Sequence, residues 1–112
     1  MSLVPENGTI YLADGTHEVA SRITIGKTVD IIGNGTKTVI TNNKNGQGVF
    51  TISAKNVGIY NCSFVNNSAN GDGGAIHNTG SDLTVSGCSF VNNSAARDGG
   101  AILNNLGSGY CG

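Results

Sequence analysis

Two aspartates and one arginine are the side chains whose types and spacing could support chemistry. Asp72 and Asp98 each precede the same Gly-Gly-Ala-Ile segment, and Arg97 stands directly before Asp98. If the two segments stack, the carboxylates could share a cation, and the arginine would lie beside them. A hard cation requires about six oxygen ligands, whereas Asp before Gly-Gly commonly forms a turn. The sequence therefore favours a turn over a cation pair at Asp72 and Asp98.

The two histidines lack the spacing expected of a catalytic or metal site. His17 and His77 have no partner residue at a ligand spacing, and Leu103 stands where the second copy of a repeat would place His77. A side chain that exchanges with leucine is poorly suited to catalysis. We therefore predict no catalytic residue, no cofactor and no metal, and expect both histidines at the surface.

The three cysteines match no metal template. Cys62, Cys88 and Cys111 include no Cys-x-x-Cys pair. We expect Cys62 and Cys88 to be reduced and buried, because in-register neighbours on parallel strands fit disulfide geometry poorly. Cys111 is expected to be exposed and could pair between chains.

The repeat that relates these residues occupies almost half of the chain. Residues 62–87 are followed by a second, incomplete copy at 88–112. Over 62–76 and 88–102 only two positions differ, Asn70 against Ala96 and Gly71 against Arg97. A unit of this size cannot bury its own apolar side chains and must stack on another copy. The repeat therefore predicts a solenoid.

Apolar residues recur in three columns, which predict three strands per turn. The columns hold Ile31, Ile59 and Val85; Cys62 with Cys88 and Phe64 with Phe90; and Phe50, Ile76 and Ile102. Strand alternation places these side chains on one face, stacked about 4.8 Å apart. We predict an all-β, single-stranded parallel β-helix of about three coils.

The two ends of this solenoid are expected to differ. Residues 1–21 are predicted to form an N-terminal cap, and residues 22–112 the coils. No comparable lid follows the second repeat, so the last coil would leave strand edges free. We expect end-to-end self-association there.

Composition excludes several classes of partner. The 112 residues carry a formal net charge of −1 with 12% charged residues, which argues against nucleic acid and anionic membranes. No apolar run is long enough to span a bilayer, and the N-terminus lacks signal-peptide features. We expect a cytosolic protein or one whose signal has been removed, and suspect a segment excised from a longer chain.

Adjacent asparagines recur at one turn of the repeat. The pairs are Asn66 with Asn67, Asn92 with Asn93 and, one coil earlier, Asn42 with Asn43. Asparagine tolerates left-handed backbone geometry, and identical amides can hydrogen-bond along a stack. We expect a structural ladder here rather than a ligand site.

The repeat resembles a known family. Phe64-Val-Asn-Asn67 and Gly73-Gly-Ala-Ile76, repeated at 90–93 and 99–102, are similar to the FxxN and GGA[ILV] motifs of polymorphic outer-membrane protein repeats. The motifs also occur in adhesin-like surface proteins of methanogenic archaea. The resemblance covers 62–104 closely and 22–106 loosely. It implies a right-handed, pectate-lyase-like β-helix that forms part of an extracellular passenger or stalk.

This resemblance leads to a functional expectation with one alternative. We expect a non-catalytic segment of a cell-surface adhesin-like protein, located outside the cell, which recognises carbohydrate or protein on host or neighbouring cells. The alternative is a relative of polysaccharide lyases or hydrolases with this fold. Asn78-Thr-Gly80 resembles the Asn-Thr-Asp motif of polygalacturonases but lacks the acid that performs the chemistry.

Overall fold

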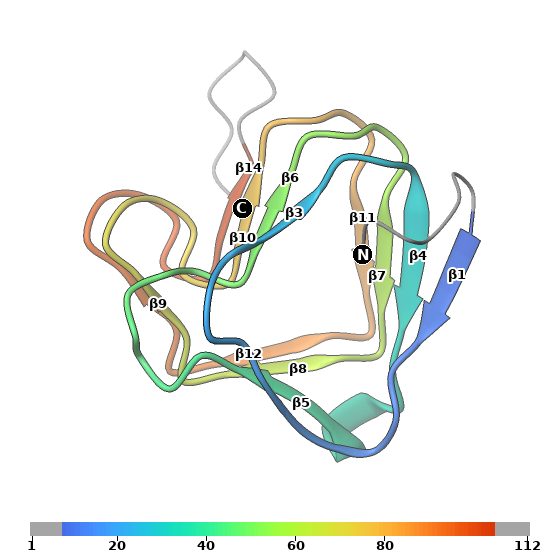
Figure 1. The fold of residues 1–112 in the computed structure, drawn as a ribbon, viewed down its shortest axis with the longest axis horizontal. Coiled ribbons are helices and arrows are strands. Elements are labelled where there is room, and N and C mark those ends of the chain that lie inside the picture. The colour runs from blue at the N-terminus through green and yellow to red at the C-terminus, as the bar shows by residue number, and fades with distance from the viewer. Residues whose placement is uncertain (1–7, 105–112) are drawn as a thin grey trace.

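Three parallel sheets of four strands each form the walls of the molecule, which we describe from a computed structural model covering residues 8–104 (Figure 1). Wall A comprises β1 (Gly8–Tyr11), β4 (Val29–Ile32), β7 (Gly58–Tyr60) and β11 (Thr84–Ser86). Wall B comprises β2 (Gly15–Glu18), β5 (Thr38–Thr41), β8 (Ser63–Val65) and β12 (Ser89–Val91). Wall C comprises β3 (Ile23–Ile25), β6 (Phe50–Ile52), β10 (Ile76–Asn78) and β14 (Ile102–Asn104).

The chain visits the walls in the order A, B, C and then begins the next turn. Three complete turns separate β1 from β11, so the predicted parallel β-solenoid of about three coils is confirmed. A short 3-10 helix, η1 (Gly35–Lys37), joins walls A and B in the second turn, and β9 (Ser68–Ala69) pairs with β13 (Ser94–Ala95) outside the walls.

Strand register follows the sequence repeat. In wall A, Ile59 pairs with Ile31 on one side and Val85 on the other. In the other walls Phe64 pairs with Phe90, and Ile76 with both Phe50 and Ile102. The three predicted columns are therefore confirmed.

Aromatic stacking joins the middle of the core to its last rung. The rings of Phe64 and Phe90 lie 5.0 Å apart at an interplanar angle of 4°, whereas Phe50 meets Phe64 edge to face at 6.0 Å. Phe64 is fully buried between these two contacts. It therefore packs wall B against wall C and against the next coil at once.

Left-handed backbone geometry produces the corners between walls. Asn61 and Gly87 occupy the corner from wall A to wall B in successive turns, with φ of 56° and 66°. Asn66 and Asn92 end the wall B strands with φ of 56°. Asparagine and glycine are the residues that adopt this conformation at low cost, which explains their recurrence at these positions.

The first coil continues the strand pattern toward the N-terminus. Strands β1 and β2 pair in parallel with β4 and β5, in the register that the later coils use. Residues 8–18 thus add a rung to walls A and B. The predicted cap boundary at residue 21 stays a prediction.

The last described rung is less covered than the rung before it. Val57, Ile59, Cys62, Phe64 and Ile76 are at most 1% exposed. Their counterparts one turn later, Leu83, Val85, Cys88, Phe90 and Ile102, are only partly buried. Each rung is therefore buried largely by its neighbours.

Phe64 and Phe90 provide a matched pair for testing this dependence. We expect Phe64→Ala to lower the free energy of unfolding by about 3–5 kcal/mol, the usual cost of emptying a buried phenylalanine site. Phe90→Ala should cost at least about 1 kcal/mol less, because part of that ring is already exposed. Urea unfolding followed by circular dichroism measures both, and equal losses would contradict the arrangement.

Candidate functional site

Loops between walls B and C project from the triangular body and form a lateral lobe (Figure 1). We define the lobe as residues 42–49, 66–75 and 92–101. Backbone hydrogen bonds join its layers. Gly48 N donates to Ser68 O and Asn70 N donates to Gly46 O, each at 2.8 Å. Over 62–76 and 88–102, both positions at which the repeat copies differ lie in this lobe. The lobe therefore combines an ordered backbone with variable side chains.

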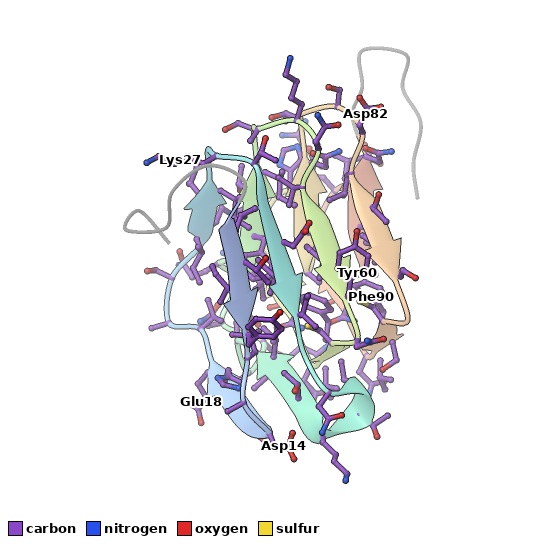
Figure 2. All side chains as sticks on the ribbon, turned by 90° about the vertical axis from the view of Figure 1, so that its right-hand side faces the viewer. Asp14, Glu18, Lys27, Tyr60, Asp82 and Phe90 are labelled. Carbon is purple, nitrogen blue, oxygen red and sulfur yellow. The ribbon has the colours of Figure 1, made fainter. Side chains whose placement is uncertain are left out.

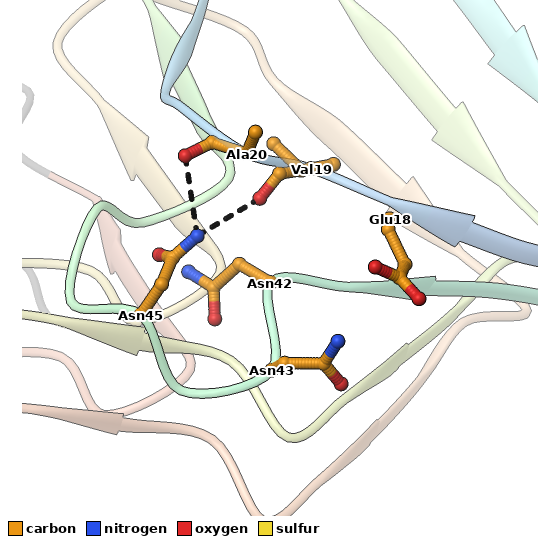
Figure 3. Close-up of a pocket in the computed structure, with 6 residues that line it drawn as sticks. All are labelled: Glu18, Val19, Ala20, Asn42, Asn43 and Asn45. Carbon is orange, nitrogen blue, oxygen red and sulfur yellow. Dashed lines mark hydrogen bonds between the residues drawn. The ribbon is translucent and has the colours of Figure 1, made fainter.

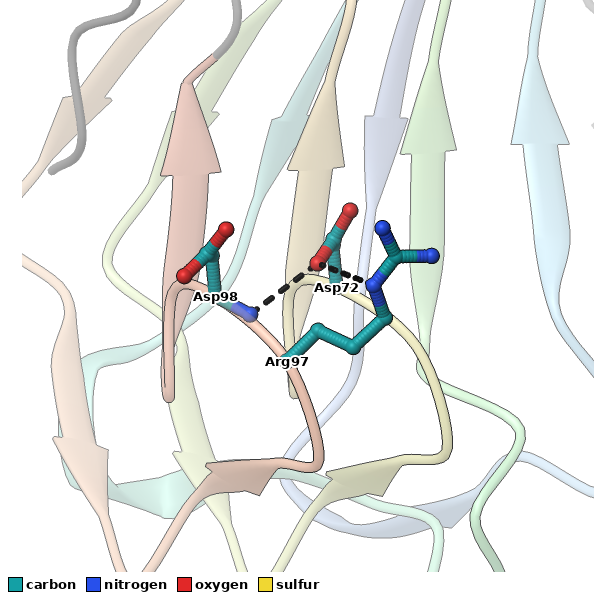
Figure 4. Close-up of polar contacts among 3 residues, drawn as sticks. All are labelled: Asp72, Arg97 and Asp98. Carbon is teal, nitrogen blue, oxygen red and sulfur yellow. Dashed lines mark hydrogen bonds and ion pairs between the residues drawn. The ribbon is translucent and has the colours of Figure 1, made fainter.

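Asp72 and Asp98 lie in successive layers of the lobe and are tied together through the backbone (Figure 4). The Asp98 amide donates to Oδ1 of Asp72 at 3.0 Å, and Nε of Arg97 lies 3.9 Å from the same oxygen. The Arg97 side chain is 73% exposed, so this ion pair contributes little to stability. The geometry is that of a turn in which one carboxylate fastens the next layer.

Metal-binding residues do not gather elsewhere in the described part of the chain. Within residues 8–104 no group of three or more His, Cys, Asp or Glu side chains is placed to hold an ion. His17 lies beside the carbonyl oxygen of Ala13, with Nε2 at 2.8 Å, and His77 is half-buried in wall C between Thr51 and Leu103. The structure brings the two histidines to different walls. That the chain uses no catalytic group or metal stays a prediction.

A hydrogen-bonded amide ladder runs along the base of the lobe. Nδ2 of the fully buried Asn67 donates to Oδ1 of Asn93 at 2.8 Å and to the carbonyl of Ile40 at 3.2 Å. Its Oδ1 accepts the backbone N–H of Asn42 at 2.7 Å, and Asn93 Nδ2 donates to Phe64 O at 2.9 Å. These amide groups are used within the fold, which supports their structural role.

The second coil enters the ladder one residue earlier than the sequence alignment predicts. Asn42, rather than Asn43, bonds to Asn67 and is buried, whereas Asn43 is exposed. The reason is the corner: positive φ falls on Asn43 and Lys44 in this coil but on Asn66 in the next. The equivalence of the Asn42–Asn43 and Asn66–Asn67 pairs is therefore wrong by one position.

A second amide contact was missed in the sequence. Nδ2 of the buried Asn78 donates to Oδ1 of Asn104 at 2.7 Å, at the end of wall C. Asn78 pairs with Ile52 in the preceding coil, so the contact begins only with the close repeat. The signal that could have revealed it is the pair of asparagines at equivalent positions of the two copies.

A hollow of about 270 Å³ opens where the first coil meets the lobe (Figure 3). It is lined by Glu18, Val19, Ala20, Asn42, Asn43 and Asn45. Asn45 Nδ2 already donates to the carbonyls of Val19 and Ala20, and Asn42 Nδ2 donates to Ser68 O. The exposed Glu18 is the one carboxylate in the lining. The hollow could hold a polar group but offers no acid–base pair.

The cysteines differ in burial more than expected. Cys62 is fully buried, and burial, with the adjacent Cys88 as a smaller cause, raises its thiol pKa to about 11. Neither thiol forms a disulfide. The prediction that Cys88 is also buried is wrong, because its rung is the last described one and leaves it half-covered. Cys111 lies outside the described residues.

The amide ladder can be tested at Asn67. We expect Asn67→Ala to lower the free energy of unfolding by about 2–4 kcal/mol, since it removes partners from the buried Ile40 carbonyl and Asn42 amide. Asn66→Gly is the matched control, because glycine accepts the φ of 56° at this exposed neighbouring position. Equal stability of the two variants in urea would refute the structural role of the ladder.

The thiols predict a dependence on pH and position. Folding raises the pKa of the Cys62 thiol, so the protonated thiol makes its full contribution to the free energy of unfolding below its ordinary pKa of 9.0. That contribution is lost as the pH rises through about 11. The stability advantage of the native chain over Cys62→Ala should therefore shrink over this range in urea titrations.

Iodoacetamide should label Cys88 of the folded chain faster than Cys62, as peptide mass spectrometry would show, and the reverse order would contradict the burial pattern.

The lobe and the strands beside it coincide with a match to a known family. The model of the Chlamydia polymorphic membrane protein repeat matches residues 61–79 and 87–105. Each match begins at a left-handed corner, Asn61 or Gly87, and runs through a wall B strand and the lobe to a wall C strand. No curated protein and no solved structure matches the chain significantly.

The resemblance indicated by the FxxN and GGA[ILV] motifs is thus confirmed. Within the described residues, no helix has the length and hydrophobicity needed to cross a membrane. Two stretches of the chain, residues 61–79 and 87–105, are thus similar to the polymorphic membrane protein repeat and stack on each other within a parallel β-solenoid.

Proposed function

We propose that this chain is a non-catalytic segment of a cell-surface adhesin-like protein, in which the solenoid supports a recognition surface. The observation that carries the proposal is the tandem match to a polymorphic membrane protein repeat. The expected partners are glycans or proteins on host or neighbouring cells. The segment would act outside the cell and make no contact of its own with membrane or nucleic acid.

The lobe is the surface we assign to recognition. Over residues 62–76 and their copy at 88–102, the apolar side chains of walls B and C are identical, and both substitutions fall in the lobe. Loops supported by a rigid scaffold commonly carry binding residues, because they change without disturbing the core. Asn70 and Gly71 in one layer, against Ala96 and Arg97 in the next, illustrate such a change.

The partly covered last rung supports a second element of the proposal. Leu83, Val85 and Phe90 are half-buried, and no strand beyond β11 and β12 pairs with them within the described residues. Free strand edges and apolar side chains favour pairing with another chain. End-to-end self-association of these segments is therefore part of what we propose.

Exchanging the two variable dipeptides tests the lobe directly. The variant places Ala-Arg at 70–71 and Asn-Gly at 96–97, so composition and net charge stay unchanged. A side chain at Gly71 meets no atom within 4 Å, so the fold should tolerate the exchange. We expect the labelled native chain to bind cultured epithelial cells saturably in flow cytometry, and the exchange to change its affinity about fivefold or more.

Lys27→Ala, at a corner outside the lobe, is the control and should bind like the native chain. Thermal unfolding would establish that all three proteins are folded. Absence of saturable binding, or equal binding by the exchanged variant, would contradict recognition by the lobe. Depolymerisation of polygalacturonate by the native chain would instead support the alternative polysaccharide-degrading function.

A further inference from the structure

The outer face of wall A carries a row of large side chains that the proposed function does not use. Tyr11, Ile32 and Tyr60 are aligned in register across β1, β4 and β7. Tyr11 is 76% exposed, and Ile32 and Tyr60 are partly buried. Adjacent strands lie about 4.8 Å apart, so the two tyrosines are separated by about 10 Å along the row.

Gly58 allows the Tyr60 ring to lie back along its own strand. A Cβ atom added at Gly58 would lie 2.6 Å from the Tyr60 hydroxyl oxygen and 2.7 Å from Oδ1 of Asp30, and would also collide with ring carbon Cε2. The tyrosine ring and the Asp30 carboxylate therefore meet over Gly58, which is buried beneath them. Figure 2 shows Tyr60 on this wall, facing the viewer.

Asp30 also borders a hollow of about 230 Å³ at the start of the wall. The lining comprises Gly8, Thr28, Val29, Asp30 and Asn56. The Thr28 hydroxyl donates its one hydrogen to the carbonyl of Lys55 at 2.6 Å, so it is not available as a donor to a ligand. Asn56 is exposed at a left-handed turn, with φ of 60°, and brings an amide to the rim. The hollow thus combines a carboxylate acceptor with an amide beside an aromatic ring.

This combination fits the chemistry of a sugar. A pyranose ring has apolar C–H faces and a rim of hydroxyl groups. A tyrosine ring lying along the wall can pack against such a face, while the carboxylate accepts charge-assisted hydrogen bonds from the rim. The one charge in the hollow lining is the negative Asp30, which repels uronic acids and favours uncharged sugars.

We propose that the outer face of wall A binds a neutral oligosaccharide, with one sugar packed on Tyr60 and hydrogen-bonded to Asp30. The chain of the ligand continues over Ile32 toward Tyr11, a span that requires at least a disaccharide. Wall A lies on the side of the triangular body away from the lobe (Figure 1). This site is therefore additional to the lobe.

Amide chemical shifts of the ¹⁵N-labelled chain test the site. The probes are cellotetraose and the tetramer of N-acetylglucosamine, with tetragalacturonate as the acidic counterpart. We expect at least one neutral tetramer to shift the amides of Asp30, Ile32 and Tyr60 saturably at millimolar concentration. Tetragalacturonate should bind about tenfold more weakly or not at all.

Two substitutions should reduce this binding by different means. In Gly58→Ala the three atoms nearest to the new methyl group belong to the side chains of Tyr60 and Asp30, so we expect it to displace the ring and the carboxylate rather than the strand. We expect about a tenfold loss of affinity. Asp30→Asn removes the charge and should cost a similar factor. Val91→Ala and Glu18→Gln make matched changes on wall B, at residues that are both exposed, and should bind within twofold of the native chain.

The proposal fails if neither neutral tetramer shifts wall A amides, if tetragalacturonate binds as tightly, or if Gly58→Ala and Asp30→Asn bind like the controls. Saturable shifts centred on the lobe instead of wall A would also overturn it, while leaving recognition by the lobe intact. Conversely, loss of cell binding in the lobe exchange with sugar binding unchanged would separate the two surfaces. Thermal unfolding of each variant distinguishes lost binding from lost structure.

Discussion

In-register stacking of one coil on the next is the constraint on which this structure depends. No single turn of the chain encloses a core, and the same positions that are fully buried in the third rung are only partly buried in the fourth. The apolar contribution to stability thus comes from contacts between neighbouring rungs, as expected for a solenoid. Phe64 illustrates this, because its ring packs on Phe90 of the next turn and on Phe50 across the core.

Polar groups obey the same constraint. A stacked coil must satisfy backbone groups at its corners, where strand pairing stops. The Asn67 amide does so by bonding to the coils on both sides. The carboxylate of Asp72 performs a related task at the lobe, where it accepts the Asp98 amide. Side chains that first suggest a binding site thus join successive layers, which explains why the repeat retains them.

The sequence predicts the walls well because period-two alternation and a 26-residue repeat leave few alternatives for the register. The columns through Ile59, Phe64 and Ile76 follow directly from it. The sequence predicts the early coils less well, because the corner residues there fall at different positions from those of the later coils. Asn42 replaces Asn43 in the ladder, and η1 interrupts the second turn. Burial of Cys88 depends on what covers its rung, which spacing alone does not reveal. Nor does a sequence show that Tyr60 folds back beside Asp30, because that placement depends on pairing between strands far apart in the chain.

The last two rungs share one strand register, and this has a consequence for how the gene can change in length. A duplication or deletion of one whole unit by slippage during replication would lengthen or shorten the rod by about 4.8 Å while keeping every column in line. A gain of only part of a unit would misalign the Phe64 and Asn67 columns and leave unpaired amides inside. The architecture therefore tolerates a change in the number of repeat units far better than a change in the length of one unit. The length of the solenoid can thus evolve separately from the structure of its two ends.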